Sequence, residues 1–277
     1  MSTANAFTRS TAQRELYGSG ARLATRTRAL HRAKTSGRPV ADVIAELAAA
    51  HLPTASGTVV ADIGCGRGTT SRVLTERLRP RCLLAVDASA AMITDARARI
   101  TGDAPIVYLQ ADFHRLPLTG AACDLVVAAF CLYHSRDPRS VVAELARVLR
   151  PGGLAALVTK SADSYQALDH LVAGAGLDPD ALERPSLYST AHSGNLPTLL
   201  PPSLRTVHLE HERHTFDFTD LGHVAAYLAT TPKYELPPGL AGDPDAITSR
   251  LRARLPDGPV HAASTVTYLL ARREDTT

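Results

Sequence analysis

The sequence predicts an α/β fold built on a mostly parallel sheet with helices on both faces. Three observations support this prediction. Short apolar runs alternate with amphipathic helical segments between residues 58 and 160, and such alternation requires crossovers between parallel strands. The chain of 277 residues is long enough to bury a large core. Its hydrophobic content of 45% excludes a disordered protein.

The expected elements follow one another in strand–helix pairs. Strands are expected at 58–63, 82–86, 106–110, 123–130 and 154–159, and helices at 69–78, 89–100 and 138–149. Residues 9–34 and 39–51 have helical patterns. After residue 160, Pro- and Gly-rich stretches separate helical pieces at 164–172, 178–183, 221–229 and 245–255 from strands at 204–210, 215–218 and 264–272.

The most informative segment is residues 59–70, with the sequence VVADIGCGRGTT. An apolar run ends at Asp62, then Gly64, Gly66 and Gly68 alternate with other residues, and a helical pattern begins at about Thr69. Glycine adopts positive φ and lets a ligand lie against the backbone. The start of a helix supplies unpaired N–H groups. We therefore predict a strand, a tight turn and a helix that together bind a nucleotide-like cofactor.

The spacing of the glycines narrows the kind of cofactor. A dinucleotide-binding turn would place its third glycine at Thr69, whereas this chain has it at Gly68. The next predicted strand ends in Asp87, 19 residues beyond Gly68. An acid at that place accepts hydrogen bonds from ribose hydroxyls in either class of cofactor.

Three further segments follow in a fixed order. Residues 106–113 form a strand ending in Asp112-Phe113, residues 123–134 form an apolar strand followed by Tyr133-His134, and residues 146–153 end a helix at Pro-Gly-Gly. With the motif Asp-x-Gly-x-Gly-x-Gly, these segments resemble the class I S-adenosylmethionine (SAM) methyltransferases over residues 58–160.

The resemblance implies a Rossmann-like sheet of seven strands, mostly parallel, with an antiparallel last strand. Residues 1–57 would form an N-terminal helical lid and residues 58–160 the SAM-binding core. Residues 161–277 would add lid insertions and the last two strands of the core sheet.

The resemblance also implies a set of SAM contacts. The glycine turn would hold the amino-acid end of SAM, Asp87 the ribose, and Asp112 the adenine amino group. The predicted cofactor-binding residues are Tyr17, Asp62, Gly64, Cys65, Gly66, Gly68, Asp87, Ala88, Met92, Ala111, Asp112, Phe113 and Phe130. Alternatives remain: Asp87 and Asp112 as ordinary helix caps, Asp62 orienting the turn, and Tyr17 packing on the core.

Two candidate catalytic residues, Tyr133 and His134, follow the fourth strand, where the acceptor would approach the methyl group. SAM carries its own electrophilic methyl group, so the protein must align the acceptor and sometimes remove a proton. A neutral imidazole at His134 suits proton removal near pH 7. The alternative is that His134 only packs or caps a helix.

Composition limits the partners. The net charge of +3 is too small to imply a nucleic acid, and no apolar run approaches the ~18 residues that a membrane span needs. The cysteines lack the Cys-x-x-Cys spacing of metal or redox sites, and we expect small apolar fillers in a reducing cytoplasm. His208, His211 and His214 would alternate faces on a strand, so no metal site is expected.

These observations predict a SAM-dependent methyltransferase that acts on O, N or C of a small-molecule acceptor, in specialised metabolism. An RNA- or protein-directed methyltransferase is one alternative, although residues 130–133 lack the Pro-Pro-Tyr motif of many RNA enzymes. A non-catalytic SAM-binding protein is the other. The sequence does not indicate the acceptor or the oligomeric state.

Overall fold

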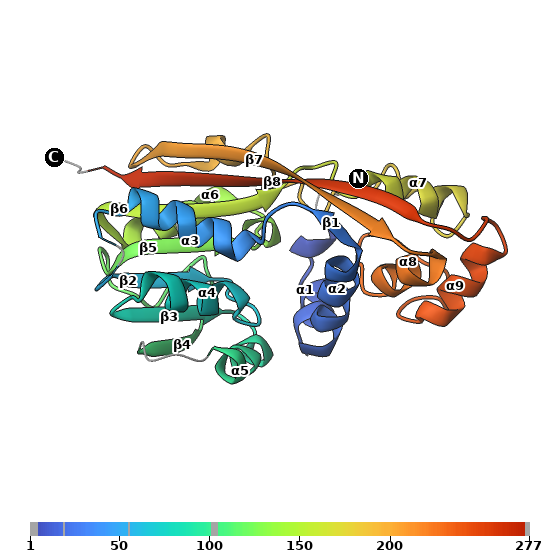
Figure 1. The fold of residues 1–277 in the computed structure, drawn as a ribbon, viewed down its shortest axis with the longest axis horizontal. Helices are drawn as coiled ribbons and strands as arrows, with labels where there is room; N and C mark the ends of the chain where they lie inside the picture. Colours follow the sequence, from blue (N-terminus) through green and yellow to red (C-terminus); the bar gives the residue numbers. More distant parts are fainter. Residues whose placement is uncertain (1–4, 19, 55, 101–104, 275–277) are drawn as a thin grey trace. The chain divides into compact units, whose positions relative to one another are not determined.

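The fold is described from a computed structural model that covers residues 5–18, 20–54, 56–100 and 105–274 (Figure 1). The chain divides into two compact units. The first, here called the helical unit, comprises the chain up to Gly37, Ser161–Ser189 and Glu212–Thr265. The second, here called the sheet unit, comprises Arg38–Lys160, Thr190–His211 and the chain from Val266 onward.

The strands of the described residues form one sheet of eight, in the order β1-β7-β8-β6-β5-β2-β3-β4. Their bounds are β1 Lys34–Ser36, β2 Val59–Ile63, β3 Cys82–Asp87, β4 Ile106–Gln110, β5 Cys123–Ala129, β6 Leu149–Lys160, β7 Leu204–Phe218 and β8 Val260–Arg273. Strands β2 to β6 pair in parallel, and β8 runs antiparallel to β6. This confirms the predicted Rossmann-like class of fold.

The helices are short and amphipathic. Their bounds are α1 Ser10–Tyr17, α2 Gly20–Ala33, α3 Val40–His51, α4 Thr69–Leu78, α5 Ala90–Arg99, α6 Pro138–Val148, α7 Gln166–Gly174, α8 Leu221–Leu228 and α9 Pro244–Arg252. Side-chain oxygens cap several of their N-termini, for example Asp137 before α6 and Asp220 before α8.

The core of the sheet unit lies between the parallel strands and helices α3, α4 and α5, which bury their apolar faces in one cluster. Strand β5 is buried at every position from Cys123 to Ala128. A strand covered on both faces needs no polar alternation, which is why its sequence is a continuous apolar run. The buried run therefore fixes β5 in the middle of the sheet.

The strand order reverses between β2 and β5. The chain passes from β2 outward to β3 and β4, then returns to the other side of β2 with β5 and β6. In open α/β sheets, ligands bind beyond the carboxyl ends of the strands at such a point. Residues after Ile63 and Ala129 therefore occupy the position expected for a binding site.

The structure differs from the sequence prediction in four places. A short strand, β1, pairs with β7 and makes the sheet eight-stranded rather than seven-stranded. Strand β6 begins at Leu149 and continues through Pro-Gly-Gly, which was expected to precede it. The two strands predicted at 204–210 and 215–218 are one strand, and residues 178–183 form turns rather than a helix.

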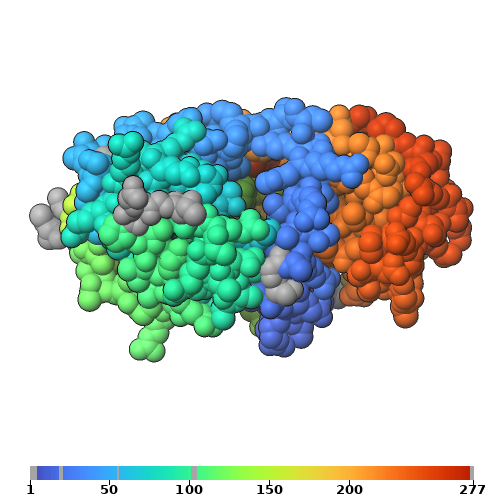
Figure 2. All heavy atoms as spheres, turned by 60° about the horizontal axis from the view of Figure 1, so that its bottom comes forward, coloured from blue at the N-terminus to red at the C-terminus, as the bar shows by residue number. Residues whose placement is uncertain are grey.

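In the helical unit, α2 packs against α8, and α8 against α9. In the space-filling view, the dark blue atoms of α1 and α2 adjoin the orange atoms around α8 (Figure 2). Aromatic rings form the centre of this unit: Tyr165, Phe216 and Tyr227 contact one another, and Phe218 contacts Tyr227. None of the helices within the described ranges is both long and apolar enough to cross a bilayer.

Candidate cofactor-binding and active site

The turn between β2 and α4 is built on three left-handed glycines. Their φ angles are 68° at Gly64, 54° at Gly66 and 79° at Gly68. A residue with a Cβ atom rarely adopts such angles, because the side chain then meets its own backbone. The alternation of glycines in the sequence therefore follows from the backbone path of the turn.

The three glycines differ in what surrounds them. A Cβ atom at Gly64 would lie 2.6 Å from the Cβ atom of Cys131, and one at Gly68 would lie 2.8 Å from Cγ1 of Ile100. A Cβ atom at Gly66 would have no atom of the described residues within 4 Å. Packing excludes a side chain at Gly64 and Gly68, whereas Gly66 faces open space where a ligand can reach the backbone.

Asp87 connects the ends of β2 and β3. Its Oδ2 accepts a hydrogen bond of 2.9 Å from the Gly66 N–H, and its Oδ1 accepts one of 2.8 Å from the Ser89 N–H. Burial raises the pKa of this carboxyl, and the two backbone N–H groups oppose the rise. Each carboxylate oxygen has a second lone pair. The carboxylate can therefore hold the turn and still accept from ribose hydroxyls, so the residues present fit SAM.

Asp62 lies beneath the turn and is 1% exposed. Its Oδ2 accepts a hydrogen bond of 2.5 Å from Ser71 Oγ in α4. Burial raises the pKa of Asp62 to about 6, although the Ser71 hydroxyl lowers it. This contact ties the strand to the following helix, which is the orienting role weighed for Asp62; direct contact with SAM stays a prediction.

Asp112 lies in the loop after β4 and is largely exposed. Its Oδ1 accepts from the His114 N–H at 2.9 Å and lies 2.7 Å from His114 Nδ1. His114 Nε2 is 2.8 Å from Ser135 Oγ. The loop after β4 is thus linked through His114 to the segment after β5, where the candidate catalytic residues lie.

Phe130 follows β5 with a φ of 56°, a left-handed conformation that is uncommon for a bulky residue. Its N–H donates to the Val158 carbonyl at 2.9 Å, and Lys160 Nζ lies 5.3 Å from the centre of its ring. Strained backbone of this kind concentrates at functional sites. The left-handed conformation of Phe130 makes the chain turn sharply after β5, where the strand order reverses.

Tyr133 and His134 form a short 3-10 helix, η2 (Leu132–His134). His134 Nδ1 lies 3.0 Å from the Cys131 carbonyl oxygen. A carbonyl oxygen only accepts, so Nδ1 carries a hydrogen, and in the neutral ring the lone pair is then on Nε2. The Tyr133 ring is buried against the imidazole, with the ring centres 4.8 Å apart. His134 therefore has the tautomer that a general base acting through Nε2 needs.

The other predicted residues lie in or beside the same strand ends, with one exception. The Cys65 N–H donates to the Val86 carbonyl, Gln110 Nε2 donates to the Ala88 carbonyl, and the Ala111 N–H donates to the Asp87 carbonyl. Met92 is fully buried in α5, and Phe113 stacks edge-on against His114. The exception is Tyr17, which ends α1 in the helical unit. Its role at the cofactor stays a prediction.

His114 and Ser135 were not singled out from the sequence. Both are common residue types in loops, and only the pairing of the two loops gives them a joint role. The feature of the sequence that could have pointed to His114 and Ser135 is their position: each follows the end of a predicted strand, close to Asp112 or His134.

The cysteines of the described residues lie in or beside the strands of the sheet unit. Cys65, Cys82, Cys123 and Cys131 are all free thiols, and all but Cys82 are buried. Burial raises the pKa of Cys123 to about 12 and also raises that of Cys65 and Cys131, so these thiols stay protonated at neutral pH. Cys131 Sγ lies 3.3 Å from the Ile63 carbonyl oxygen, to which it can donate, which anchors the site backbone.

Comparisons with known proteins agree with this geometry. Residues 61–157 match the family described as methyltransferase domain. The chain is 37% identical over 122 residues to a malonyl-[acyl-carrier protein] O-methyltransferase of Marinomonas sp. (strain MWYL1), an alignment that covers 44% of this chain and 45% of that protein. The chain thus spans less than half of the length of this curated relative.

Two solved structures share the fold. The YcgJ protein of Bacillus subtilis superposes with a TM-score of 0.55 at 16% identity, covering 85% of this chain and 98% of that one. The [4+2]-cyclase SpnF superposes with a TM-score of 0.51 at 18% identity, covering 87% and 85%. Over residues 61–157, the sheet unit is therefore similar to a methyltransferase domain.

Two glycine substitutions separate packing from ligand access. Gly64→Ala and Gly66→Ala both place a side chain at positive φ, which costs about 1–2 kcal/mol, but only Gly64→Ala also meets Cys131. We expect Gly64→Ala to lower the free energy of unfolding by about 1–3 kcal/mol more than Gly66→Ala does. Urea denaturation of both variants measures this difference, and equal losses would contradict the packing at Gly64.

The raised pKa of Asp62 predicts a pH dependence of stability. Its ordinary pKa is 3.8 and the folded value is about 6, so the folded protein binds this proton more tightly than the unfolded chain. The resulting stabilisation is full below pH 4 and is lost as the pH rises through 6. In Asp62→Asn, the unfolding free energy relative to wild type should rise by about 2 kcal/mol between pH 4 and pH 7. Denaturation curves at several pH values test this, and a constant difference would refute it.

Proposed function

We propose that this protein is a SAM-dependent methyltransferase that transfers a methyl group to a small-molecule acceptor. The observation that carries the proposal is the contact between Asp87 and Gly66, which joins an acid at the end of β3 to the open glycine of the turn after β2. A ribose-binding acid and a bare backbone are both needed to hold a nucleoside cofactor. In this chain the Asp87 carboxylate and the backbone of Gly66 are joined by a hydrogen bond.

SAM, when bound, supplies a methyl group that is already electrophilic. The chain has four tasks. Gly64, Gly66 and Gly68 would leave room for the amino-acid end of the cofactor, and Asp87 would hold its ribose. Asp112, fixed by His114, would accept from the adenine amino group. His134 would take a proton from the acceptor through Nε2.

The acceptor is proposed to be a small molecule. The relative from Marinomonas is named as an O-methyltransferase, which supports an oxygen acceptor in this chain. Its alignment is confined to less than half of either chain, so the remainder of this chain is free to recognise a different acceptor. The low net charge favours a metabolite over a nucleic acid, and we place the reaction in the specialised metabolism of a cytoplasm.

A second candidate function is a reaction other than methyl transfer on the same fold. The structural neighbour SpnF is named a [4+2]-cyclase, so this fold supports more than one kind of chemistry. The two functions differ in one measurable product. A methyltransferase converts SAM to S-adenosylhomocysteine in step with a methylated acceptor, whereas a cyclase leaves SAM unchanged.

The test is to incubate the full chain with SAM and a panel of phenols, alcohols, amines and carboxylic acids, and to follow both products by mass spectrometry. Stoichiometric S-adenosylhomocysteine and methylated acceptor would support the proposal. Tight binding of SAM without turnover on any acceptor would favour the binding-protein or cyclase alternative. Failure to bind SAM would contradict both the methyltransferase proposal and this alternative.

Removal of the Asp87 carboxylate should weaken the cofactor complex. We expect Asp87→Ala to lower the affinity for S-adenosylhomocysteine by about 1–3 kcal/mol, the scale of hydrogen bonds to a charged acceptor. Glu76→Ala is the control, because Glu76 is exposed and pairs with Arg72 on the surface of α4. Titration calorimetry compares the two variants, and an unchanged affinity in Asp87→Ala would exclude a contact with the ribose.

His134 should act on turnover and not on cofactor binding. In His134→Gln, we expect kcat to fall by about 10²–10⁴, the usual contribution of a general base, while the affinity for S-adenosylhomocysteine stays the same. Full turnover in the variant would leave His134 with a packing role alone.

A further inference from the structure

An open cavity of about 540 Å³, here called the polar groove, lies within the helical unit, and every residue that lines it belongs to that unit. It is lined by β7 and β8, which are neighbours in the sheet, and by the segment that leads into α7. Its volume is in the range of small-molecule sites. None of the residues predicted for the cofactor or the reaction lines it. The polar groove is therefore a candidate for a separate ligand site.

The side of the groove formed by β7 is polar because the side chains of a strand point alternately to its two faces. Arg213, Thr215 and Asp217 line the groove from this strand. Phe216 and Phe218 alternate with them and belong to the aromatic centre of the unit. Arg213 and Asp217 are four positions apart, so their Cα atoms are about 13 Å apart along the strand. The groove therefore offers polar groups over a length that suits a ligand with two separate polar ends.

The segment before α7 is held firmly against β8. The Ser161 N–H donates to the Thr265 carbonyl and the Tyr165 N–H donates to the Ala263 carbonyl, both at 2.8 Å. Tyr165 has a φ of 65°, and its ring is buried in the aromatic centre. Because the backbone is fixed on both sides of Asp163, this acid has a defined place in the lining of the groove.

Two opposite charges in the groove have no partner among the described residues. No carboxylate lies within 4.0 Å of the Arg213 guanidinium, and no cationic nitrogen lies within 4.0 Å of the Asp163 carboxylate. The two groups therefore do not neutralise each other, although they line the same cavity. The other acid of the lining is occupied, since Asp217 Oδ1 lies 2.7 Å from His261 Nδ1. One cation and one anion remain available to a ligand.

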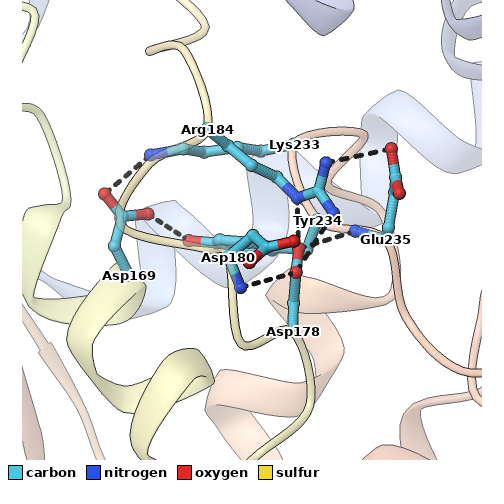
Figure 3. A network of polar contacts seen from close by, with 7 residues as sticks. All are labelled: Asp169, Asp178, Asp180, Arg184, Lys233, Tyr234 and Glu235. Carbon is cyan, nitrogen blue, oxygen red and sulfur yellow. Dashed lines mark hydrogen bonds and ion pairs between the residues drawn. The ribbon is translucent and has the colours of Figure 1, made fainter.

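Elsewhere in this unit, acids that hold the fold together are paired with cations (Figure 3). Asp169 accepts from Lys233 Nζ at 2.6 Å, and Asp178 accepts from the Arg184 guanidinium. Both of these acids are buried, whereas Asp163 and Arg213 are exposed and make no such contact. We therefore expect substitution of either groove residue to leave the fold intact.

We propose that the polar groove binds a small zwitterion, with the carboxylate of the ligand on Arg213 and its ammonium group on Asp163. A guanidinium binds a carboxylate through two parallel hydrogen bonds, and an acid binds an ammonium group through charge-assisted ones. A simple carboxylic acid would be repelled by Asp163, and a simple amine would be repelled by Arg213. Only a ligand with both charges satisfies both side chains. This inference does not depend on the proposed function.

The distance between the two charges of the ligand is set by the groove. The charged atoms of Arg213 and Asp163 are more than 4.0 Å apart, so the ligand must span the space between them. The probes are glycine, 4-aminobutanoate and 6-aminohexanoate, in which the charges are increasingly far apart. The controls are butanoate and hexanoate, which lack the amine, and butylamine and hexylamine, which lack the acid.

Titration calorimetry on the full chain measures binding. We expect one of the amino acids to bind about tenfold or more tightly than the acid and the amine used as controls. Arg213→Met and Asp163→Asn should each weaken that binding by about tenfold. The matched controls are Arg254→Met and Glu183→Gln, because both residues are exposed in the same unit and do not line the groove.

The control variants should bind the amino acid as wild type does, and thermal melting should show that all four variants are folded. The proposal is overturned if no amino acid binds in preference to the acid and the amine. It is also overturned if Arg213→Met or Asp163→Asn binds as tightly as wild type, or if the control variants lose as much affinity as these two.

One further arm separates the groove from the cofactor site, because S-adenosylhomocysteine also ends in an amino acid. Saturating S-adenosylhomocysteine should leave the affinity for the amino-acid probe unchanged, and Arg213→Met should bind S-adenosylhomocysteine as wild type does. Competition between the two, with a tenfold loss in Arg213→Met, would assign the groove to the cofactor and overturn a separate site. A wild-type protein that does not bind S-adenosylhomocysteine would contradict the proposed function, while the amino-acid probes would still decide on the groove.

Discussion

The hydrogen bond from the Gly66 N–H to the Asp87 carboxylate is the contact on which the rest of the site depends. It joins the turn after β2 to the end of β3, and so brings a bare backbone and an acid to the place where the strand order reverses. The turn can follow this path because glycine has no Cβ atom and therefore adopts positive φ readily. At Gly64, a Cβ atom would also clash with Cys131. The loops after β4 and β5 then complete the same edge of the sheet, joined through His114 and Ser135.

The two units treat buried charge differently. In the sheet unit, Asp62 is buried against Ser71, which donates to it from its hydroxyl and its backbone N–H, and burial still raises the pKa of Asp62 to about 6. In the helical unit, Asp169 and Asp178 are balanced by cations, whereas the described partners of Arg26 are hydroxyl groups. Balanced pairs hold a structure together at little net gain.

Much of the sheet unit could be predicted from the sequence, because its strands are buried on both faces and appear as apolar runs. The glycine spacing and the acid at the end of β3 could likewise be recognised in the sequence, and the structure joins them by a hydrogen bond. The remainder depends on tertiary contacts that leave little trace in sequence. Strand β6 extends through Pro-Gly-Gly and residues 204–218 form a single strand because neighbouring strands supply hydrogen-bond partners. The link from His114 to Ser135 and the burial of Arg26 likewise require partners distant in the chain.

The most direct test of this account is a crystal structure of the full chain with S-adenosylhomocysteine. The account predicts that the ribose hydroxyls donate to Asp87 while its bond to the Gly66 N–H persists, with the amino-acid end of the ligand along the open side of the turn. A ligand bound elsewhere, or a ribose that makes no contact with Asp87, would contradict it.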